Sequence, residues 1–368
     1  MRAGSSSHFI GLMSGTSMDG VDGALLSFDE AGTCRLLGHQ HVPFTSEIRS
    51  GLLELNCTGA NEIERSHLLG NRLARVYAEN VATLLNHAGL ATNDIAAIGC
   101  HGQTIRHRPD LGFTVQIGNA ALLAELSGIS VVADFRSRDV AAGGQGAPLV
   151  PAFHQAVFAD AALHRVVVNI GGISNLSDLP PSGGPCGFDC GPGNLLMDGW
   201  IQRHTGQAYD DNGVWAASGK VLPALLQALL AHPFFAMPPP KSTGRDEFYL
   251  AWLDQHMLPG YAPADVQATL LEVTARGIAD AVKAYCHGAD EVFLCGGGAH
   301  NGKLASRLQQ LLPDSAVALT DALGWDASLV EAAAFAWLAR QTLLGQPGNL
   351  PAVTGACGPR VLGAIYPA

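Results

Sequence analysis

A glycine-rich loop at residues 11–23, GLMSGTSMDGVDG, lies between two apolar runs and constrains the fold more than any other part of the chain. Phe9 and Ile10 lead into the loop and residues 21–28 lead out of it, which predicts a strand, a turn and a strand. The loop lacks the lysine of the G-x-x-x-x-G-K-[ST] motif and the spacing of G-x-G-x-x-G, and no helical pattern follows it at once. We therefore interpret it as a phosphate-binding hairpin, with an ordinary β-turn as the alternative.

The residue types in this loop suit a phosphate that is accompanied by a cation. We expect Gly11, Gly15 and Gly20 to adopt positive φ and to bring backbone N–H groups against an anion, with the neighbouring hydroxyls as further donors. Asp19 and Asp22 would repel a bare phosphate, but carboxylates hold Mg²⁺ directly or through its waters. The loop thus predicts a Mg²⁺ site at Asp19 and Asp22, within a nucleotide-binding set made of Gly15, Thr16, Ser17, Met18, Asp19, Gly20, Val21 and Asp22.

The same design recurs at residues 165–179, RVVVNIGGISNLSDL. This stretch again predicts a strand, a turn at Gly171 and Gly172, and a second strand. The chain therefore looks like two halves with equivalent openings. Two phosphate hairpins, one per half and facing each other across a cleft, resemble the plan of the sugar kinase, actin and heat-shock chaperone ATPase superfamily.

A third glycine cluster lies at residues 291–301, EVFLCGGGAHN, where a short strand ends in three glycines. A helix is expected to follow from about Gly302 to Leu312. Bare backbone at such a junction lets a flat ligand such as adenine or ribose lie directly on it, although a tight connection without any ligand is the alternative. The nucleotide contacts predicted in the second half are Gly171, Gly172, Gly296, Gly297, Gly298 and Asn301.

Motifs along nearly the whole chain resemble those of the anhydro-N-acetylmuramic acid kinase family. Besides the loop at 11–23, they are HGQT (101–104), QIGN (116–119), ADFR (133–136), AAGGQGAP (141–148), NIGG (169–172), FDCGPGN (188–194), STGR (242–245) and GGGAHN (296–301). Two positions depart from the family pattern. Cys190 stands where threonine is usual, and Asp246 stands where glutamate is common; we expect both to adjust the geometry without changing the reaction.

The resemblance implies an α/β fold made of two RNase H-like domains of the actin and sugar kinase ATPase type, with a central nucleotide cleft. It also implies an enzyme that uses ATP and Mg²⁺. Such an enzyme opens the 1,6-anhydro ring of anhydro-N-acetylmuramic acid with water and phosphorylates the freed O6. The products are N-acetylmuramic acid 6-phosphate and ADP, in peptidoglycan recycling and amino-sugar catabolism.

The hydrophobic pattern supports alternating helices and strands. Apolar residues recur at intervals of three and four over 68–85, which predicts a helix with one buried stripe, and the run 95–98 predicts a strand. We place the crossing between the domains near residue 132. The expected domains are 1–132, with the first phosphate hairpin, and 133–368, with the second hairpin and the glycine cluster; packing of the extreme C-terminus back on the first half is left open.

Asp189 is the candidate catalytic base. It follows the short run 186–188 and precedes Gly-Pro-Gly-Asn, so we expect its carboxylate to sit on a constrained turn at the cleft. The resemblance implies that it activates water for attack on the anomeric carbon, while the bridging oxygen takes the γ-phosphoryl group. An Asx-turn or a helix N-cap before Leu195 is the alternative role.

Four residues are candidates for the sugar. His101 and Thr104 have side chains that hydrogen-bond hydroxyls or an acetamido group, although a histidine in a loop also serves structure alone. Arg136, Arg138 and Arg245 are cations in glycine-flanked segments, and we favour Arg138 for the lactyl carboxylate over a surface ion pair. The family suggests Glu331 as a further sugar contact, with a solvated helix face as its alternative role.

Composition limits the partners. The chain has 368 residues and a formal net charge of -11, with no basic run, which argues against nucleic acid. Its eight cysteines lack metal-ligand spacing and are expected to be reduced thiols. No apolar run is long enough to cross a membrane, so we expect a cytoplasmic protein that acts on a small sugar without a membrane partner. A homodimer is compatible with the sequence.

Other functions remain open at this point. They are another sugar kinase of the same fold, a nucleotide-gated binding module and a simple glycosidase. A glycosidase would need a second carboxylate paired with the first, which the sequence does not reveal. A chaperone-like module would need a peptide-binding appendage beyond the two halves.

Overall fold

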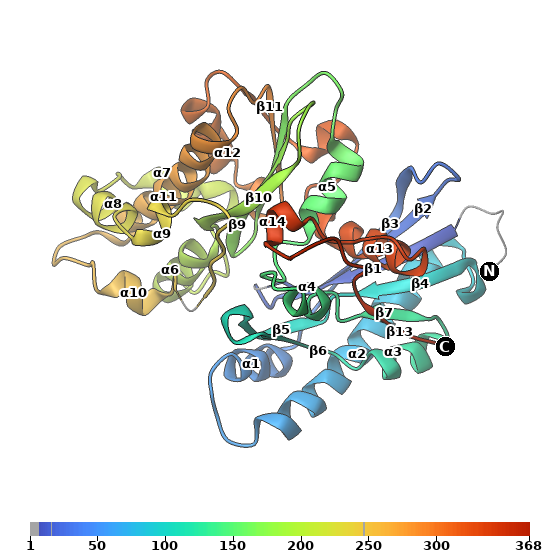
Figure 1. Ribbon diagram of the computed structural model, residues 1–368. Helices are drawn as coiled ribbons and strands as arrows, with labels where there is room; N and C mark the ends of the chain where they lie inside the picture. The colour runs from blue at the N-terminus through green and yellow to red at the C-terminus, as the bar shows by residue number, and fades with distance from the viewer. Residues whose placement is uncertain (1–6, 16, 246) are drawn as a thin grey trace. The chain divides into compact units, whose positions relative to one another are not determined.

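The computed structural model describes residues 7–15, 17–245 and 247–368 (Figure 1). The chain forms two compact units: the first contains the chain up to Phe153 together with Leu329–Ala368, and the second is His154–Ser328. The boundary between the two units therefore lies at residue 153, whereas the sequence predicted it after residue 132. The reason is that strand β7 (Val131–Ala133) pairs with β4 (Ile95–Cys100) of the first unit, and buried Asp139 is bonded by Asn349 and Thr354 of the returning C-terminal segment.

The first unit is built on a sheet of six strands in the order β13-β7-β4-β1-β2-β3. Strands β1 (Ser7–Met13), β2 (Gly20–Phe28) and β3 (Cys34–Pro43) form an antiparallel meander. Strand β4 is parallel to β1, β7 is parallel to β4, and β13 (Ala364–Tyr366) closes the edge antiparallel to β7.

The sheet of the second unit repeats this plan in the order β10-β9-β8-β11-β12. Strands β8 (Arg165–Ile170), β9 (Ile173–Leu179) and β10 (Cys186–Pro192) form the antiparallel meander. Strands β11 (Glu291–Cys295) and β12 (Ala316–Leu319) add parallel partners beyond β8. Three antiparallel strands followed by two parallel strands, occurring twice, confirm the predicted pair of RNase H-like α/β domains.

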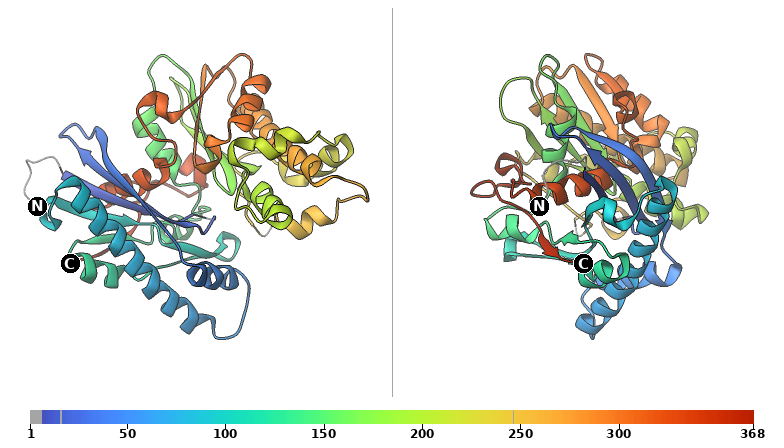
Figure 2. Two further views of the ribbon diagram at one scale, coloured as in Figure 1. Left: turned by 180° about the vertical axis from the view of Figure 1, so that it is seen from behind. Right: turned by 90° about the vertical axis from the view of Figure 1, so that its right-hand side faces the viewer.

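Helices cover both faces of the first sheet. Helix α2 (Glu62–Ala88) packs on β2 and β3 and meets α3 (Ala120–Ser127), while α13 (Val330–Leu343) packs on β1, β4 and β2 (Figures 1 and 2). Two glycines allow α13 to approach so closely. A Cβ on Gly11 would lie 1.8 Å from the carbonyl oxygen of Ala332, and one on Gly99 would lie 2.0 Å from that of Phe335.

Helix α11 (Pro263–Tyr285) is the central helix of the second unit. It packs against β10 and β9 and is contacted by α6 (Leu195–Thr205), α7 (Val214–Ser218), α8 (Pro223–Leu230) and α12 (Gly302–Leu311). Fifteen of its residues are buried, Gln267 and Glu272 among them. The predicted helices over 68–85 and from Gly302 are confirmed, as are the strands at 95–98 and 165–179.

Short elements complete the two units. The first contains α1 (Ser46–Leu55), α4 (Ser137–Ala141), α14 (Pro351–Thr354), the hairpin β5 (Gln103–Arg108) and β6 (Phe113–Ile117), and the 3₁₀ turns Thr92–Asp94 and Pro109–Leu111. The second contains α9 (Pro233–Ala236), α10 (Leu250–Asp254) and the 3₁₀ turns Asp211–Gly213, Gly297–His300 and Thr320–Leu323. Helix α5 (Val150–Phe158) spans the division. Among the residues described, no helix is long and apolar enough to cross a membrane.

Candidate active site

The first hairpin turn lies between β1 and β2 and is fixed by hydrogen bonds to a neighbouring segment. The buried Ser14 hydroxyl donates to the carbonyl of Gly102 at 3.0 Å and lies 2.9 Å from the Tyr77 hydroxyl. The side-chain amide of Gln103 donates to the carbonyl of Gly15 at 3.0 Å. Gly102 and Gln103, which follow β4, therefore hold the turn in place through these hydrogen bonds. Thr16, predicted to bind nucleotide, lies outside the described residues.

The positive φ expected for the glycines in this turn is wrong. Gly11, Gly15 and Gly20 all lack positive φ, and among the described residues of the turn Met18 is left-handed, at φ 55°. Gly11 is needed because α13 crosses it, and Gly20 because a Cβ there would lie 2.5 Å from the carbonyl oxygen of Val42. Two of the three glycines thus serve close packing.

The two carboxylates predicted to hold Mg²⁺ lie near a histidine that the sequence did not reveal. Asp22 faces His41 across the β2–β3 ladder, and its Oδ1 lies 2.7 Å from Nδ1 of His41. The hydrogen bond to Asp22 raises the pKa of His41, and the charge of Asp19 adds to the effect. Asp19 is exposed and accepts a hydrogen bond from the Ser17 hydroxyl at 2.6 Å.

Asp19 and Asp22 could supply only some of the ligands of a Mg²⁺ ion. Two carboxylates leave room for the waters and phosphate oxygens that Mg²⁺ retains. The part of the chain that the structure describes holds no group of three or more His, Cys, Asp or Glu side chains arranged around a metal. Any ion bound here must also displace or share the His41 contact of Asp22.

His101 follows β4 and is buried, with 5% of its surface exposed. Its Nε2 accepts hydrogen bonds from the Arg136 guanidinium, at 3.1 Å from Nε and 3.0 Å from one terminal nitrogen. Burial and the Arg136 charge lower the pKa of His101 to about 3. The ring is therefore neutral at physiological pH, and the Arg136 bonds place its single proton on Nδ1.

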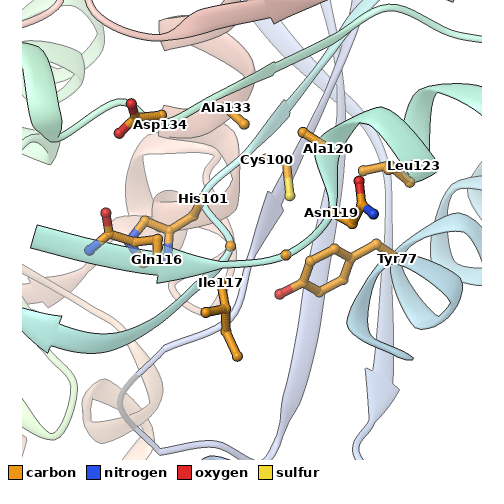
Figure 3. Close-up of a pocket in the computed structure, with 12 residues that line it drawn as sticks. Tyr77, Cys100, His101, Gln116, Ile117, Asn119, Ala120, Leu123, Ala133 and Asp134 are labelled. Atoms are coloured by element: carbon orange, nitrogen blue, oxygen red, sulfur yellow. The ribbon is translucent and has the colours of Figure 1, made fainter. Parts of the chain in front are cut away.

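A small pocket lies beside His101 (Figure 3). Tyr77 of α2, Asn119 and Leu123 at α3, and Cys100 at the end of β4 line it together with His101. Its volume of about 30 Å³ is close to the space of a water molecule and far below that of a sugar.

The other three sugar candidates lie on different elements of the first unit. Thr104 is on β5, where its hydroxyl accepts a hydrogen bond from Gln116 at 3.1 Å. Arg138 is exposed on α4, directly before the buried Asp139, which accepts the N–H of Gly146 at 2.8 Å. Glu331 is half-buried in the first turn of α13.

In the second unit, the turn at Gly171 and Gly172 is held against the start of α6. The carbonyl of Gly172 accepts the N–H groups of Gly193 and Leu195, at 2.9 and 3.2 Å, and the carbonyl of Gly171 accepts that of Asn194 at 2.8 Å. A Cβ on Gly193 would lie 2.2 Å from the carbonyl oxygen of Gly171. The FDCGPGN stretch therefore holds the second hairpin turn through backbone hydrogen bonds.

The glycine cluster after β11 approaches the same turn. A Cβ on Gly298 would lie 2.4 Å from a methyl of Ile170 and 2.6 Å from Oδ1 of Asn194, and Gly296 has φ 81°. Gly297 differs, because a Cβ there would meet nothing within 4 Å. Asn301 is the N-cap of α12 and accepts the N–H of Leu304 at 3.1 Å, so its side chain already has a structural role.

Asp189 lies within strand β10, opposite Asn175 of β9, and not on the turn or helix cap considered from the sequence. A bulge follows it between Asp189 and Gly191. The side chain is 8% exposed, and its Oδ2 accepts the N–H of Thr243 at 2.9 Å. Its own N–H donates to the carbonyl of Lys241 at 3.1 Å. The bulge lies near the end of the strand that leads to Gly193.

Lys241 is the residue near Asp189 that sequence reasoning missed. It is 6% exposed, and its ammonium lies 4.6 Å from the ring centre of Phe234 and 5.9 Å from that of Phe188. Of the two departures from the family pattern, Cys190 is buried beside Asp189, and burial raises its pKa. Asp246 lies outside the described residues.

Within each unit, the structure thus brings part of the predicted site together. In the second unit, the turn at Gly171 and Gly172 adjoins residues 193–195 and the cluster at 296–298, and Asp189 lies on the strand that leads to Gly193. In the first unit, the turn at 14–19 adjoins the segment that carries His101.

Comparison with known proteins gives one consistent family. The model of the anhydro-N-acetylmuramic acid kinase family matches residues 7–368. A protein of that name from Nitrosospira multiformis is 58% identical over 363 residues, covering 98% of this chain and 99% of its own. Another, from Cupriavidus pinatubonensis, is 58% identical over 368 residues, covering 98% of both chains. A solved structure, the (R)-2-hydroxyglutaryl-CoA dehydratase component A of Acidaminococcus fermentans, is 13% identical with a TM-score of 0.49, covering 90% of this chain and 98% of that one.

Proposed function

Because the chain belongs to the anhydro-N-acetylmuramic acid kinase family, we propose that Asp189 is the base of that family's reaction in this protein. The reaction is an ATP-dependent opening of 1,6-anhydro-N-acetylmuramic acid by water with phosphorylation of O6. It yields N-acetylmuramic acid 6-phosphate and ADP, and it serves peptidoglycan recycling and amino-sugar catabolism. The observation that carries the proposal is the fixed, largely buried carboxylate of Asp189, on the strand that leads to the residues holding the glycine turn.

Asp189 acts on water and not on a sugar hydroxyl. The carboxylate takes a proton from the water as its oxygen bonds to the anomeric carbon C1. The C1–O6 bond breaks, and O6 keeps the bonding electrons and attacks the γ-phosphorus of ATP, which releases ADP. Negative charge on O6 is thereby captured by phosphorus, so no separate acid is required. The Thr243 N–H supports this role because it holds one carboxylate oxygen in place.

The nucleotide is bound by backbone in our proposal. Gly171 and Gly172 approach its phosphates from the second unit, and Gly296, Gly297 and Gly298 receive the adenosine. Gly297 supports the adenosine assignment best, since its surroundings are open while its neighbours are tightly packed. Asn301 would take part through its backbone, because its side chain caps α12.

In the first unit we assign the β- and γ-phosphates to residues 15–22. Asp19 and Asp22 would hold Mg²⁺, which neutralises phosphate charge when bound. For the sugar, we assign His101, Thr104, Arg138 and Glu331. Arg138 is suited to the lactyl carboxylate because its guanidinium is exposed on α4. His101 is suited to donate through Nδ1, because Arg136 occupies Nε2.

A cytoplasmic location and a homodimer complete the proposal. The cytoplasm supplies the ATP that the reaction consumes, and light scattering on the purified protein tests the dimer.

Turnover of the anhydro sugar with and without MgATP tests the proposed function. We expect N-acetylmuramic acid 6-phosphate only when ATP is present. Turnover without ATP would indicate a glycosidase, and no turnover in either case would indicate a binding module. Phosphorylation of an ordinary hexose in preference to the anhydro sugar would indicate a different sugar kinase.

A further inference from the structure

A crevice of about 440 Å³ lies within the second unit, where α7, α11 and α12 meet (Figure 1). Its volume falls within the roughly 300–1,000 Å³ of small-molecule sites. None of the residues that we assign to nucleotide, metal or sugar lines it. One side is apolar and is formed by Ala217, Val221, Ala268 and Leu271. The crevice is thus large enough for a ligand and is not accounted for by the proposed function.

The other side of the crevice carries positive charge. Glu272 is 4% exposed and is held between two arginines: Arg307 donates to both of its carboxylate oxygens, at 2.7 and 2.8 Å, and Arg276 donates to one, at 2.7 Å. Lys303 precedes Arg307 by one helical turn, so the two cations share a face of α12. Three cations against one carboxylate leave a net charge of +2, in a chain whose net charge is -11. This local positive charge favours an anionic ligand.

Two of the cations have donors available. Arg276 bonds Glu272 through Nε, and its two terminal nitrogens form no hydrogen bond with any residue that the structure describes. Lys303 is exposed and pairs with no group in the described part of the chain. Arg307 differs, because its remaining terminal nitrogen donates to Gln310 at 3.0 Å. Arg307 and Glu272 therefore form a fixed wall, while Arg276 and Lys303 can bind a ligand. Since Glu272 already orders Arg276, binding loses less side-chain freedom there.

We propose that this crevice is a binding site, separate from the proposed active site, for a small phosphorylated organic molecule. Its phosphate contacts Arg276 and Lys303, because guanidinium and ammonium donors form short, charge-assisted hydrogen bonds with phosphate oxygens. Its carbon framework lies on the apolar side, which an inorganic anion would leave in contact with water. A nucleotide and a sugar phosphate share this chemistry. The inference does not depend on the reaction proposed above.

Isothermal titration calorimetry on the full chain tests the site with three probes: AMP, glucose 6-phosphate and inorganic phosphate. Saturating Mg²⁺ and a nonhydrolysable ATP analogue occupy the proposed nucleotide site beforehand. We expect at least one organic probe to bind with a Kd below about 1 mM, and inorganic phosphate to bind at least about tenfold more weakly. Binding of AMP alone would identify a nucleotide site, and binding of glucose 6-phosphate alone would identify a sugar phosphate site.

Substitutions locate the bound probe. Lys303→Gln and Arg276→Gln should each raise its Kd by about tenfold or more, because each removes a charged hydrogen bond to the phosphate. Lys283→Gln, at an exposed lysine of α11 that does not line the crevice, should leave the Kd unchanged. Thermal unfolding checks that each variant is folded. If Arg276→Gln does not fold, the exposed Lys303 decides the question alone.

Four results would overturn the proposal. They are no binding of either organic probe, an unchanged Kd in folded Lys303→Gln, inorganic phosphate that binds as tightly as the organic probes, and binding seen only without the ATP analogue. In the last case the crevice would belong to the nucleotide site. None of these experiments measures turnover, so a protein that fails to phosphorylate the anhydro sugar overturns the proposed function and not this site.

Discussion

The main-chain N–H of Thr243 donates to Oδ2 of Asp189 at 2.9 Å, while the N–H of Asp189 donates to the carbonyl of Lys241 at 3.1 Å. This pair of bonds ties the strand that carries the carboxylate to the segment that follows α9. The orientation of Asp189 is thus set by backbone atoms, which substitution of neighbouring side chains leaves in place. A carboxylate fixed in this way is suited to one direction of proton transfer.

Replacing Asp189 by asparagine tests the base directly. The amide keeps the shape but accepts no proton, so turnover should fall by roughly 10²–10⁴ while MgATP still binds. In ¹⁸O-labelled water, the wild-type product should carry the label at C1 and none in the transferred phosphate. Label in the phosphate would contradict attack of water on the anomeric carbon.

Replacing Asp19 by asparagine tests the Mg²⁺ assignment. Loss of one of two carboxylates should raise the Mg²⁺ concentration needed for half-maximal turnover by about tenfold or more. Asp110→Asn is a matched control, because Asp110 is an exposed carboxylate of the same unit that pairs with Arg108. If the Mg²⁺ dependence of Asp19→Asn is unchanged, Asp19 does not bind the metal and the assignment is wrong.

Gly297 and Gly298 form a matched pair for the adenosine site. Alanine at Gly297 has open space, so it should leave the melting temperature unchanged and raise the KM for ATP several-fold if adenosine lies on this backbone. Alanine at Gly298 would meet Ile170 and Asn194, so it should lower stability by about 1–3 kcal/mol. If Gly297→Ala has the wild-type KM for ATP, adenosine does not lie there.

Because two histidines are buried in the neutral form, we expect the free energy of unfolding to fall in mild acid. Burial lowers the pKa of both His101 and His154 to about 3, from 6.5. Between those values the unfolded chain binds more protons than the folded one, so stability is complete above pH 6.5 and falls as the pH decreases toward 3. Each histidine contributes at most about 1.4 kcal/mol per pH unit.

Urea unfolding at pH 7 and pH 5 checks this expectation. His154→Gln should reduce the difference between the two pH values in the second unit, and substitution of the exposed His287 should not. Equal pH dependence in wild type and His154→Gln would mean that other groups cause the acid sensitivity.

Local patterns predicted the elements but not their partners. The apolar stripe over 68–85 was sufficient to predict helix α2, and the two strand–turn–strand patterns were sufficient to predict both hairpins. Periodicity and turn residues are local signals, so they can be read from the sequence. His41 was missed because only the register of β2 against β3 brings it to Asp22. Lys241 stands one residue before the STGR motif, and its contact with β10 depends on tertiary packing.

The positive φ predicted for Gly11, Gly15 and Gly20 was wrong for a related reason. The sequence does not distinguish a glycine needed for close packing from one needed for positive φ, and α13, which packs on Gly11, comes from the far end of the chain. The placement of Asp189 on a turn failed because a bulge, not a turn, follows it. The domain division failed because residues 133–153 are held by the C-terminal segment.

The contact of α13 with Gly11 and Gly99 also has a consequence for the order of biosynthesis. The second unit is continuous in sequence, whereas the first needs Leu329–Ala368 to cover one face of its sheet and to add its last strand. On the ribosome, strands β1–β3 emerge about 300 residues before the helix that covers them. The first unit therefore begins to emerge before the second unit but is completed after it, and loss of residues 329–368 would leave the earlier-made strands uncovered.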